Sequence, residues 1–247
     1  MFLWNEEKVQ FMEAAAAWSD YYPRLAALLA DVLGGARHVC DAGCGTGHLA
    51  LALSAHIPQV TAVDISPQAL ALLADSCRRQ GVENVTIRQG DIHRLAPEAP
   101  YDAMVFSFFG RMEEILPLAR AQCRGCVVAI MRRDTHHRFS AGQPPVRTGG
   151  YYRGVETLRR FGIPFQGQEL TLPMGQPFRS LAEARRFFEL YRRPEDDTPI
   201  TDAALLARLT ATGREDFPLY LPQERRFGLL RWAAQDIPDT TETGDRL

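Results

Sequence analysis

The chain has 247 residues, of which 46% are hydrophobic and 23% are charged, and its formal net charge is -2. This composition is typical of a globular domain with a sizeable core, and the charge gives no general attraction to nucleic acid or to an anionic membrane. Five cysteines without a framework-like spacing argue against a secreted disulfide scaffold. No apolar run approaches the roughly 18 residues that span a bilayer, and no basic segment leads into an apolar stretch at the start. We therefore expect a cytoplasmic protein.

The first 35 residues are expected to form a helical segment. Ala14 to Ala17 is a strong helix-forming run, and Pro23 interrupts the pattern. A second helix is predicted from about Tyr22 to Leu33, where Gly34-Gly35 ends it. Residues 1–35 are thus predicted to precede the main domain.

Short apolar segments alternate with helix-forming segments from residue 36 to Met131. Strands are predicted at 38–40, 60–65, 85–87, 103–108 and 127–131, and helices at 49–53, 70–79 and 113–122. Ser66-Pro67 is expected to start the second of these helices, and Gly81 to end it. Strands that are apolar on both faces and alternate with helices predict a parallel sheet covered on both sides.

The pattern is weaker beyond Met131. Residues 132–150 are polar and contain Pro144-Pro145, which predicts a loop. Helices are predicted at 155–161, 181–191 and 201–210, and strands at 169–172 and 227–232. Within a main domain spanning 36–238, residues 178–222 are expected to form a helical lid or insertion, and the polar residues 239–247 a disordered tail.

Three glycines, Gly43, Gly45 and Gly47, lie between a predicted strand and a predicted helix. Glycines let the backbone approach a ligand closely, although a tight strand-to-helix turn would also use them. Asp41 ends the strand before this loop, and Asp64 ends the second strand about 20 residues later, the spacing at which an acid accepts hydrogen bonds from ribose hydroxyls. The pattern predicts a nucleotide-like ligand.

A nicotinamide or flavin site is the main alternative for this loop. Its fingerprint requires a small residue at position 48, where this chain has His48. The carboxylate of Asp41 would also repel a pyrophosphate. Both details favour a cationic cofactor over a dianionic dinucleotide.

Four segments carry a family resemblance. Residues 41–47 resemble motif I of the class I S-adenosylmethionine methyltransferases, and 60–66, 89–92 and 101–105 are similar to that family's acidic strand end, adenine segment and fourth strand. The resemblance covers about residues 36–131, in the family's order. It implies an enzyme with an α/β, Rossmann-like seven-stranded sheet of order 3-2-1-4-5-7-6, with N-terminal helices and a helical insertion near the C-terminus. It also implies S-adenosylmethionine as cofactor and S-adenosylhomocysteine as product.

The resemblance also implies roles for matching residues. The implied cofactor-binding set is Asp41, Gly43, Cys44, Gly45, Thr46, Gly47, Asp64, Ile65, Asp91, Ile92 and Ser107. The glycines would pass beneath the methionine part, and Asp41 would contact its amino group directly or through water. Asp64 would hold the ribose and Asp91 the adenine amino group, with Ile65 and Ile92 flanking the ring. Each acid has an alternative interpretation as a helix cap or turn residue.

The acceptor is expected at the carboxyl end of the fourth strand, at 106–111, because ligands bind there in parallel sheets. This segment lacks the Asn/Asp-Pro-Pro-Tyr/Phe signature, which counts against exocyclic or amide nitrogens as acceptors. Phe108 and Arg111 are candidate substrate-binding residues, although Phe108 and Phe109 could equally pack in the core. Arg179 is a candidate for binding an acidic group, or else a surface arginine paired with Glu183.

Methyl transfer is an in-line displacement that needs no fixed catalytic triad. His136 and His137 are candidate proton acceptors, or else part of a solvated loop. Tyr21 or Tyr22 is expected to touch the cofactor or the acceptor. No metal is expected, because Cys123-x-x-Cys126 is a single pair that is better interpreted as buried thiols, and only Asp134 is available for a catechol-type site.

The expected function is methyl transfer from S-adenosylmethionine to a small molecule. An RNA or protein methyltransferase is the first alternative, weakened by the slightly acidic charge and by the lack of an RNA-binding appendage. A non-catalytic cofactor-binding or partner-binding protein is the second. Neither a membrane nor a nucleic acid is expected as partner, and the oligomeric state stays open.

Overall fold

The computed structural model describes residues 6–133, 149–192 and 197–239, which form two compact units. The larger unit takes its described residues from 22–133, 149–170 and 226–239. The smaller unit takes its described residues from 6–21, 171–192 and 197–225. Each unit therefore combines segments that are far apart in the sequence.

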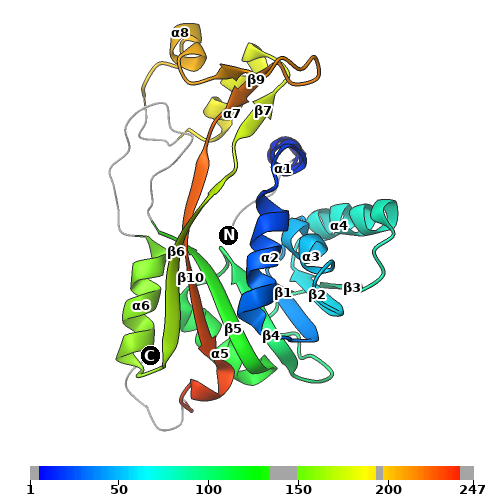
Figure 1. Cartoon of the computed structure of the whole chain (residues 1–247), viewed down its shortest axis with the longest axis vertical. Coiled ribbons are helices and arrows are strands. Elements are labelled where there is room, and N and C mark those ends of the chain that lie inside the picture. Colours follow the sequence, from blue (N-terminus) through cyan, green and yellow to red (C-terminus); the bar gives the residue numbers. More distant parts are fainter. Residues whose placement is uncertain (1–5, 134–148, 193–196, 240–247) are drawn as a thin grey trace. The chain divides into compact units, whose positions relative to one another are not determined.

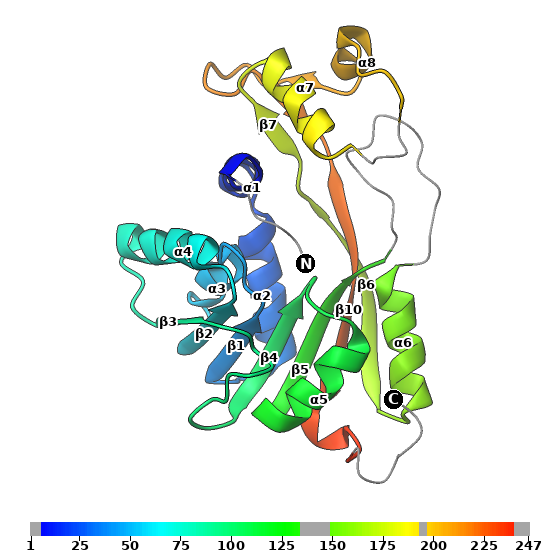
Figure 2. The ribbon, with the colours of Figure 1, turned by 180° about the vertical axis from the view of Figure 1, so that it is seen from behind.

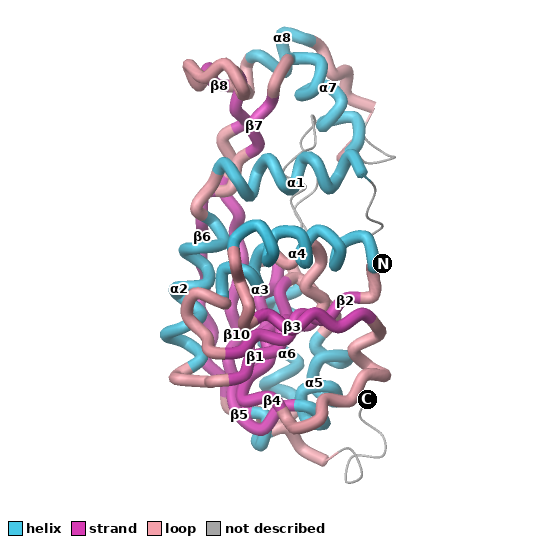
Figure 3. The backbone as a smooth tube through the Cα atoms, turned by 90° about the vertical axis from the view of Figure 1, so that its right-hand side faces the viewer, coloured by secondary structure: helices cyan, strands magenta, loops and turns pink. Residues whose placement is uncertain are grey.

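A seven-stranded sheet forms the centre of the larger unit (Figure 1). Its strands are β1 (His38–Ala42), β2 (Gln59–Asp64), β3 (Val85–Gln89), β4 (Tyr101–Ser107), β5 (Cys123–Arg132), β6 (Phe165–Pro173) and β10 (Glu224–Ala233). Their order is β3-β2-β1-β4-β5-β10-β6, and β10 runs antiparallel to β5. Because the last strand lies between the fifth and sixth, the predicted order 3-2-1-4-5-7-6 is confirmed. The edge strand β3 lies nearest the viewer in the side view of Figure 3.

Helices cover both faces of this sheet, as the parallel strand pattern predicts. On one face lie α2 (Tyr21–Leu33), α3 (His48–Leu53) and α4 (Pro67–Gln80); on the other lie α5 (Met112–Gln122) and α6 (Gly150–Arg160) (Figures 1 and 2). The expected limits of α4 are confirmed. The Ser66 hydroxyl accepts a hydrogen bond from Ala69 N at 3.2 Å, Pro67 occupies the first turn, and Gly81 ends the helix with φ 65°.

The smaller unit has its own core. It contains α1 (Glu6–Trp18), α7 (Leu181–Leu190), α8 (Asp202–Leu206) and an antiparallel sheet of order β7-β9-β8, with β7 at Gln176–Phe178, β8 at Thr210–Ala211 and β9 at Leu219–Leu221. Phe11 of α1 packs edge-to-face on Phe187 of α7, with ring centroids 4.9 Å apart. The N-terminal helix is therefore built into a core whose other residues come from the last third of the chain.

Several expected limits differ from the structure. The insertion contains helices, as expected, but also three short strands, and the helix predicted over 201–210 ends at Leu206 because Thr210 and Ala211 pair with β9. β6 and β10 extend beyond the predicted 169–172 and 227–232.

The domain boundaries expected from the sequence stay a prediction. By compactness, the chain divides between Tyr21 and Tyr22, within α2. Of the expected tail, only Asp239 is described, and its carboxylate accepts a hydrogen bond from Arg120 Nη2 at 2.7 Å. Within the described ranges, no helix combines the length and the apolar character needed to cross a membrane.

Candidate functional site

The loop after β1 depends on left-handed backbone at its three glycines. Gly43, Gly45 and Gly47 have φ of 72°, 57° and 76°, a region that side chains other than glycine rarely adopt. The amides of Gly43 and Cys44 donate to the carbonyl of Val63 at 2.8 and 3.0 Å. These bonds hold the loop against the end of β2.

Two of these glycines also leave no room for a side chain. A Cβ on Gly47 would lie 2.5 Å from Leu73 Cδ1 of α4, and a Cβ on Gly43 would lie 2.1 Å from Phe109 Cδ2. Both distances are far below van der Waals contact, so the positions require glycine on steric as well as conformational grounds. Phe109 thus lies directly against the loop.

Asp64 bridges the two loops at the ends of β1 and β2. Its Oδ2 accepts from Gly45 N at 2.8 Å, and its Oδ1 accepts from Ser66 N at 2.9 Å. A carboxylate has about four lone-pair sites, so both oxygens keep the capacity to accept a further hydrogen bond. The backbone fixes this carboxylate in place, and its expected bond to a ribose stays a prediction.

Asp41 is buried in β1 with only 1% of its surface exposed. Among the described residues, neither of its carboxylate oxygens makes a hydrogen bond of normal length and angle, although the backbone N–H of Ala50 acts on it from nearby and opposes the rise of its pKa. Burial, and then the negative charge of Asp64, raise the pKa of Asp41 to about 7. Because an unpaired buried carboxylate is costly, this position favours a cationic or hydrogen-bond-donating ligand.

The residues expected around an adenine differ in exposure. Ile65 is 53% exposed, whereas Ile92 is 4% exposed and belongs to the core. Asp91 Oδ1 accepts from His93 N at 3.0 Å, and its Oδ2 lies 3.6 Å from Arg94 Nε at the surface. Asp91 therefore has the turn arrangement that was its alternative interpretation, and its role toward adenine stays a prediction.

The remaining members of the implied cofactor set lie at the same sheet edge. Cys44 donates a weak hydrogen bond to the carbonyl of Gly45, at 3.7 Å from Sγ, and burial raises the pKa of its thiol. Thr46 is buried within the loop, and Ser107 is the last residue of β4. Their contacts with a cofactor stay predictions.

Two phenylalanines follow β4 and point to different neighbours. Phe108 has φ 55°, the one positive φ of a non-glycine residue in the described part of the chain. Its N–H donates to Ile130 O at 2.8 Å, and its ring packs edge-to-face on Phe227 at 6.2 Å. The Phe109 ring stacks on Phe106 at 6.3 Å, with 21° between the ring planes. An aromatic residue in this backbone conformation carries strain, which often accompanies functional sites.

The two candidate arginines both have acidic partners. Arg111 precedes α5, and its Nη2 lies 3.3 Å from Glu114 Oε1 at the exposed surface. Arg179 Nη1 lies 2.8 Å from Glu183 Oε1, and its guanidinium lies 4.8 Å from the ring centroid of Phe217. Arg179 thus forms the ion pair that was its alternative interpretation.

The two candidate tyrosines of α2 have different surroundings. Tyr22 stacks on His48, the first residue of α3, with centroids 5.1 Å apart and 30° between the planes. Tyr21 is fully buried, and the guanidinium of Arg225 lies 5.3 Å from its ring centroid. Tyr22 thus contacts a residue that follows the glycine loop directly. No spacing rule links a residue of α2 with one of α3, so the sequence did not predict this stack.

The other candidate groups add little to this site. His136 and His137, like Asp134, lie outside the described residues. Cys123 is buried, which raises the pKa of its thiol to about 11, and it donates to the carbonyl of Cys126 at 3.5 Å from Sγ. Among the described residues, no group of three or more His, Cys, Asp or Glu side chains could hold a metal ion.

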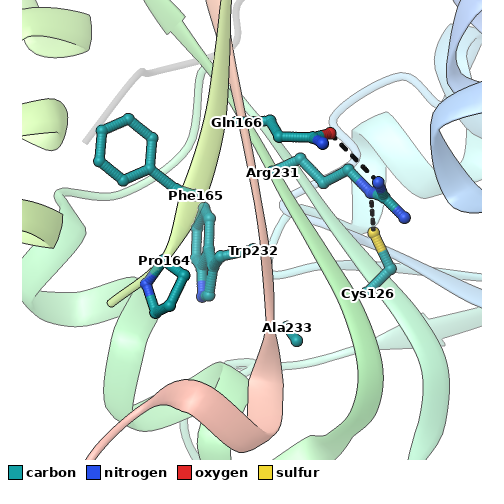
Figure 4. A pocket seen from close by; sticks show the side chains of 7 residues that line it. All are labelled: Cys126, Pro164, Phe165, Gln166, Arg231, Trp232 and Ala233. Carbon is teal, nitrogen blue, oxygen red and sulfur yellow. Dashed lines mark hydrogen bonds between the residues drawn. The ribbon is translucent and has the colours of Figure 1, made fainter. Parts of the chain in front are cut away.

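A separate hollow of about 360 Å³ lies near the start of β5 (Figure 4). It is lined by Cys126, Pro164, Phe165, Gln166, Arg231, Trp232 and Ala233. Arg231 donates to Cys126 Sγ at 3.4 Å and to Gln166 Oε1 at 3.2 Å. The glycine loop follows the carboxyl end of β1, and β1 is parallel to β4 and β5. The hollow lies near the start of β5, so it is at the opposite ends of these strands from the glycine loop. It contains no acid or histidine, and it is not the candidate site.

Comparison with known proteins identifies similar sequences. A family model described as a methyltransferase domain matches residues 39–127. A Methanothermobacter thermautotrophicus protein named "probable cobalt-precorrin-6B C(15)-methyltransferase (decarboxylating)" is 34% identical over 144 residues, which are 55% of this chain and 66% of that protein. A Brucella suis protein named "uncharacterized RNA methyltransferase" is 38% identical over 127 residues, which are 49% of this chain and 29% of that protein. The chain therefore spans just under two thirds of the first relative and less than a third of the second.

One solved structure extends the likeness beyond the matched segment. The YcgJ protein from Bacillus subtilis has a TM-score of 0.55 with 16% identity, and the alignment covers 84% of this chain and 97% of that chain. At this identity the likeness concerns the fold, and it agrees with the observed seven-stranded sheet.

Proposed function

We propose that the chain is a class I S-adenosylmethionine-dependent methyltransferase, which binds S-adenosylmethionine at residues 41–47 and methylates a small molecule. The observation that carries this proposal is the buried, unpaired carboxylate of Asp41 beside a glycine loop. Opposite charge stabilises a buried carboxylate, and S-adenosylmethionine carries an ammonium group. A dinucleotide would instead bring a pyrophosphate toward the same carboxylate.

In this proposal, the residues of the chain bind the cofactor and orient it. Asp41 pairs with the ammonium group, and Asp64, fixed by two backbone amides, accepts hydrogen bonds from the ribose. The exposed side chain of Ile65 gives one face of the adenine an apolar contact. When bound, the cofactor supplies a methyl group that its sulfonium has already activated. The protein must therefore mainly align the acceptor and exclude water.

A small-molecule acceptor is supported by the name of the Methanothermobacter relative and by the net charge of -2. The first alternative, an RNA acceptor, is supported by the name of the Brucella relative. The segment 106–111 that would face either acceptor contains three phenylalanines, and its one cation, Arg111, is paired with Glu114; this suits an acceptor with an apolar body better than a phosphate backbone. Tyr22, which stacks on His48 just after the glycine loop, is our candidate for a group that touches the cofactor or acceptor.

Calorimetric titration with S-adenosylmethionine tests the cofactor. We expect binding to strengthen as pH rises from 5.5 to 7, because the pKa of Asp41 is about 7 and the cation requires the ionised carboxylate. Binding should therefore release a proton in this range. Asp41→Asn should weaken binding by about 1.5–3 kcal/mol and remove this pH dependence.

Asp64→Ala should also weaken binding, whereas Asp75→Asn, in an exposed ion pair on α4, is the control and should not. Absence of binding, or equal affinities for the wild-type protein and the two site variants, would contradict the proposed cofactor site. Incubation with labelled S-adenosylmethionine and either a metabolite extract or RNA then identifies the acceptor class. Label in neither fraction, with binding intact, would instead favour the non-catalytic alternative.

A further inference from the structure

The turn after β4 sends two neighbouring rings in different directions. Phe108, at φ 55°, and Gly110, at φ 70°, both have left-handed backbone, and the residue between them is Phe109. The Phe108 ring packs on Phe227 of β10, while the Phe109 ring lies against Gly43 of the glycine loop. The backbone of this turn therefore determines where the Phe109 ring lies.

The Phe109 ring contacts the core and still keeps part of its surface exposed. It stacks on Phe106 and packs on the core, yet it is only half-buried. Within the described residues, four guanidinium–ring pairs involve rings of the smaller unit and a fifth involves Phe161 at the end of α6, and none involves Phe109. No described cation thus uses this ring.

If the proposed function is correct, the position of the ring relative to Asp41 places it near the sulfonium of the bound cofactor. In S-adenosylmethionine the sulfonium lies four bonds, or about 5 Å, from the ammonium nitrogen. With the ammonium at Asp41, the sulfonium falls within reach of Gly43, two residues further along the chain and in contact with Phe109. An aromatic ring attracts a cation that lies against its face.

We propose that Phe109 recognises the sulfonium charge and so distinguishes S-adenosylmethionine from S-adenosylhomocysteine. Both ligands carry the same ammonium, ribose and adenine, so Asp41 and Asp64 bind them alike. Only the first carries a positive charge on sulfur. S-adenosylhomocysteine has no charge on sulfur, so the ring would contribute to the binding of S-adenosylmethionine an attraction that it does not contribute to the binding of the product.

Phe109→Leu tests this role, because leucine keeps an apolar side chain of similar reach and lacks the ring. Calorimetry of the full chain measures the affinities for S-adenosylmethionine and S-adenosylhomocysteine. We expect the ratio of the two affinities to shift about two- to thirty-fold against S-adenosylmethionine. Phe109→Tyr keeps the ring and should keep the wild-type ratio. Phe165→Leu is the matched control, since Phe165 is also a half-buried phenylalanine on the same core but lines the hollow near the opposite edge.

The ratio of the two affinities distinguishes recognition of the sulfonium by Phe109 from a purely structural role of its ring. Equal losses of affinity for both ligands in Phe109→Leu would mean that the ring only supports the loop, and would overturn the proposal. If thermal melting shows that this variant does not fold, the same ratio is measured on Phe109→Met. If the wild-type protein binds neither ligand, the proposed function itself fails. If it binds both and the ratio is unchanged in the variants, only the role of Phe109 fails.

Discussion

Gly43 and Gly81 have similar backbones and different surroundings. Their φ values are 72° and 65°, but a Cβ on Gly43 would meet the Phe109 ring at 2.1 Å, whereas a Cβ on Gly81 would meet no atom within 4 Å. Left-handed backbone costs a residue with a Cβ about 1–2 kcal/mol at either place. The two positions therefore separate conformational strain from steric exclusion.

Gly43→Ala is expected to destabilise the protein more than Gly81→Ala. The second change should cost about 1 kcal/mol of unfolding free energy from strain alone. The first should cost about 2–5 kcal/mol, because forcing a methyl group against Phe109 adds an overpacking penalty. Urea denaturation of both variants measures the difference. Equal losses would mean that the Phe109 ring moves aside freely.

The sequence predicted the positions of some residues of this site and not of others. Asp41, Asp64 and the glycines could be placed from the sequence, because motif spacing fixes their positions at strand ends. Asp91 and Arg179 could not be distinguished from ordinary turn and surface residues, and in the structure they make a turn hydrogen bond and a surface ion pair. The position of Phe109 depends on the backbone of a turn, which no motif specifies.

At the scale of elements, the carboxylate of Asp102 connects three strands, β1, β4 and β5, at the strand ends away from the glycine loop. Asp102 of β4 accepts hydrogen bonds from Arg37 N at 3.0 Å and His38 N at 2.9 Å, where β1 starts. It also accepts one from Arg124 Nε of β5 at 2.9 Å. The bond from Arg124, with those from the two amides, lowers the pKa of Asp102.

Asp102→Ala is expected to lower the unfolding free energy at pH 7 by about 1–3 kcal/mol, because hydrogen bonds to charged groups are lost. A lowered folded-state pKa gives stability that is present above the unfolded value of about 3.9 and is lost as pH falls through the folded value. The difference between wild type and variant should therefore shrink below about pH 4. Denaturation at pH 7 and pH 3 measures it, with the exposed Asp75→Ala as the control. A difference independent of pH would contradict this account.

The strands of the first half of the sheet were predictable because they are local, apolar and bounded by turn residues. The outer strands β6 and β10 were longer than predicted; they are neighbours in the sheet, and pairing with a neighbour leaves no period in the sequence of a strand. The short strands β7, β8 and β9 were missed for the same reason. A segment of two or three residues is too short to show an alternating hydrophobic pattern. These segments are strands because they pair with one another.

At the scale of the whole molecule, α1 connects the start of the chain with its last third. Phe11 is 5% exposed, and its ring lies 4.9 Å from Phe187 and 6.3 Å from Phe178. An exposed ion pair between Glu7 and Arg186 joins the same elements. The core of the smaller unit is therefore incomplete without the N-terminal helix.

Phe11→Ala is expected to destabilise the smaller unit by about 3–5 kcal/mol. Because each unit has its own core, hydrogen exchange should rise in α7 and β9 and stay unchanged in β1 and β4. Leu29→Ala, in α2 of the larger unit, is the matched control and should give the reverse pattern. Equal increases throughout the chain would show that the two units unfold together.

The dependence of α1 on distant residues has a consequence during synthesis. Phe11 leaves the ribosome about 200 residues before Leu221, which at ordinary translation rates is about 10–40 s. Over that interval the nascent helix exposes its apolar face, while strands β1 to β4 gain their pairing partners and β5 still lacks β10. Chaperones that hold exposed hydrophobic segments would therefore meet this protein first at its N-terminus, and release it only when the last third of the chain has emerged.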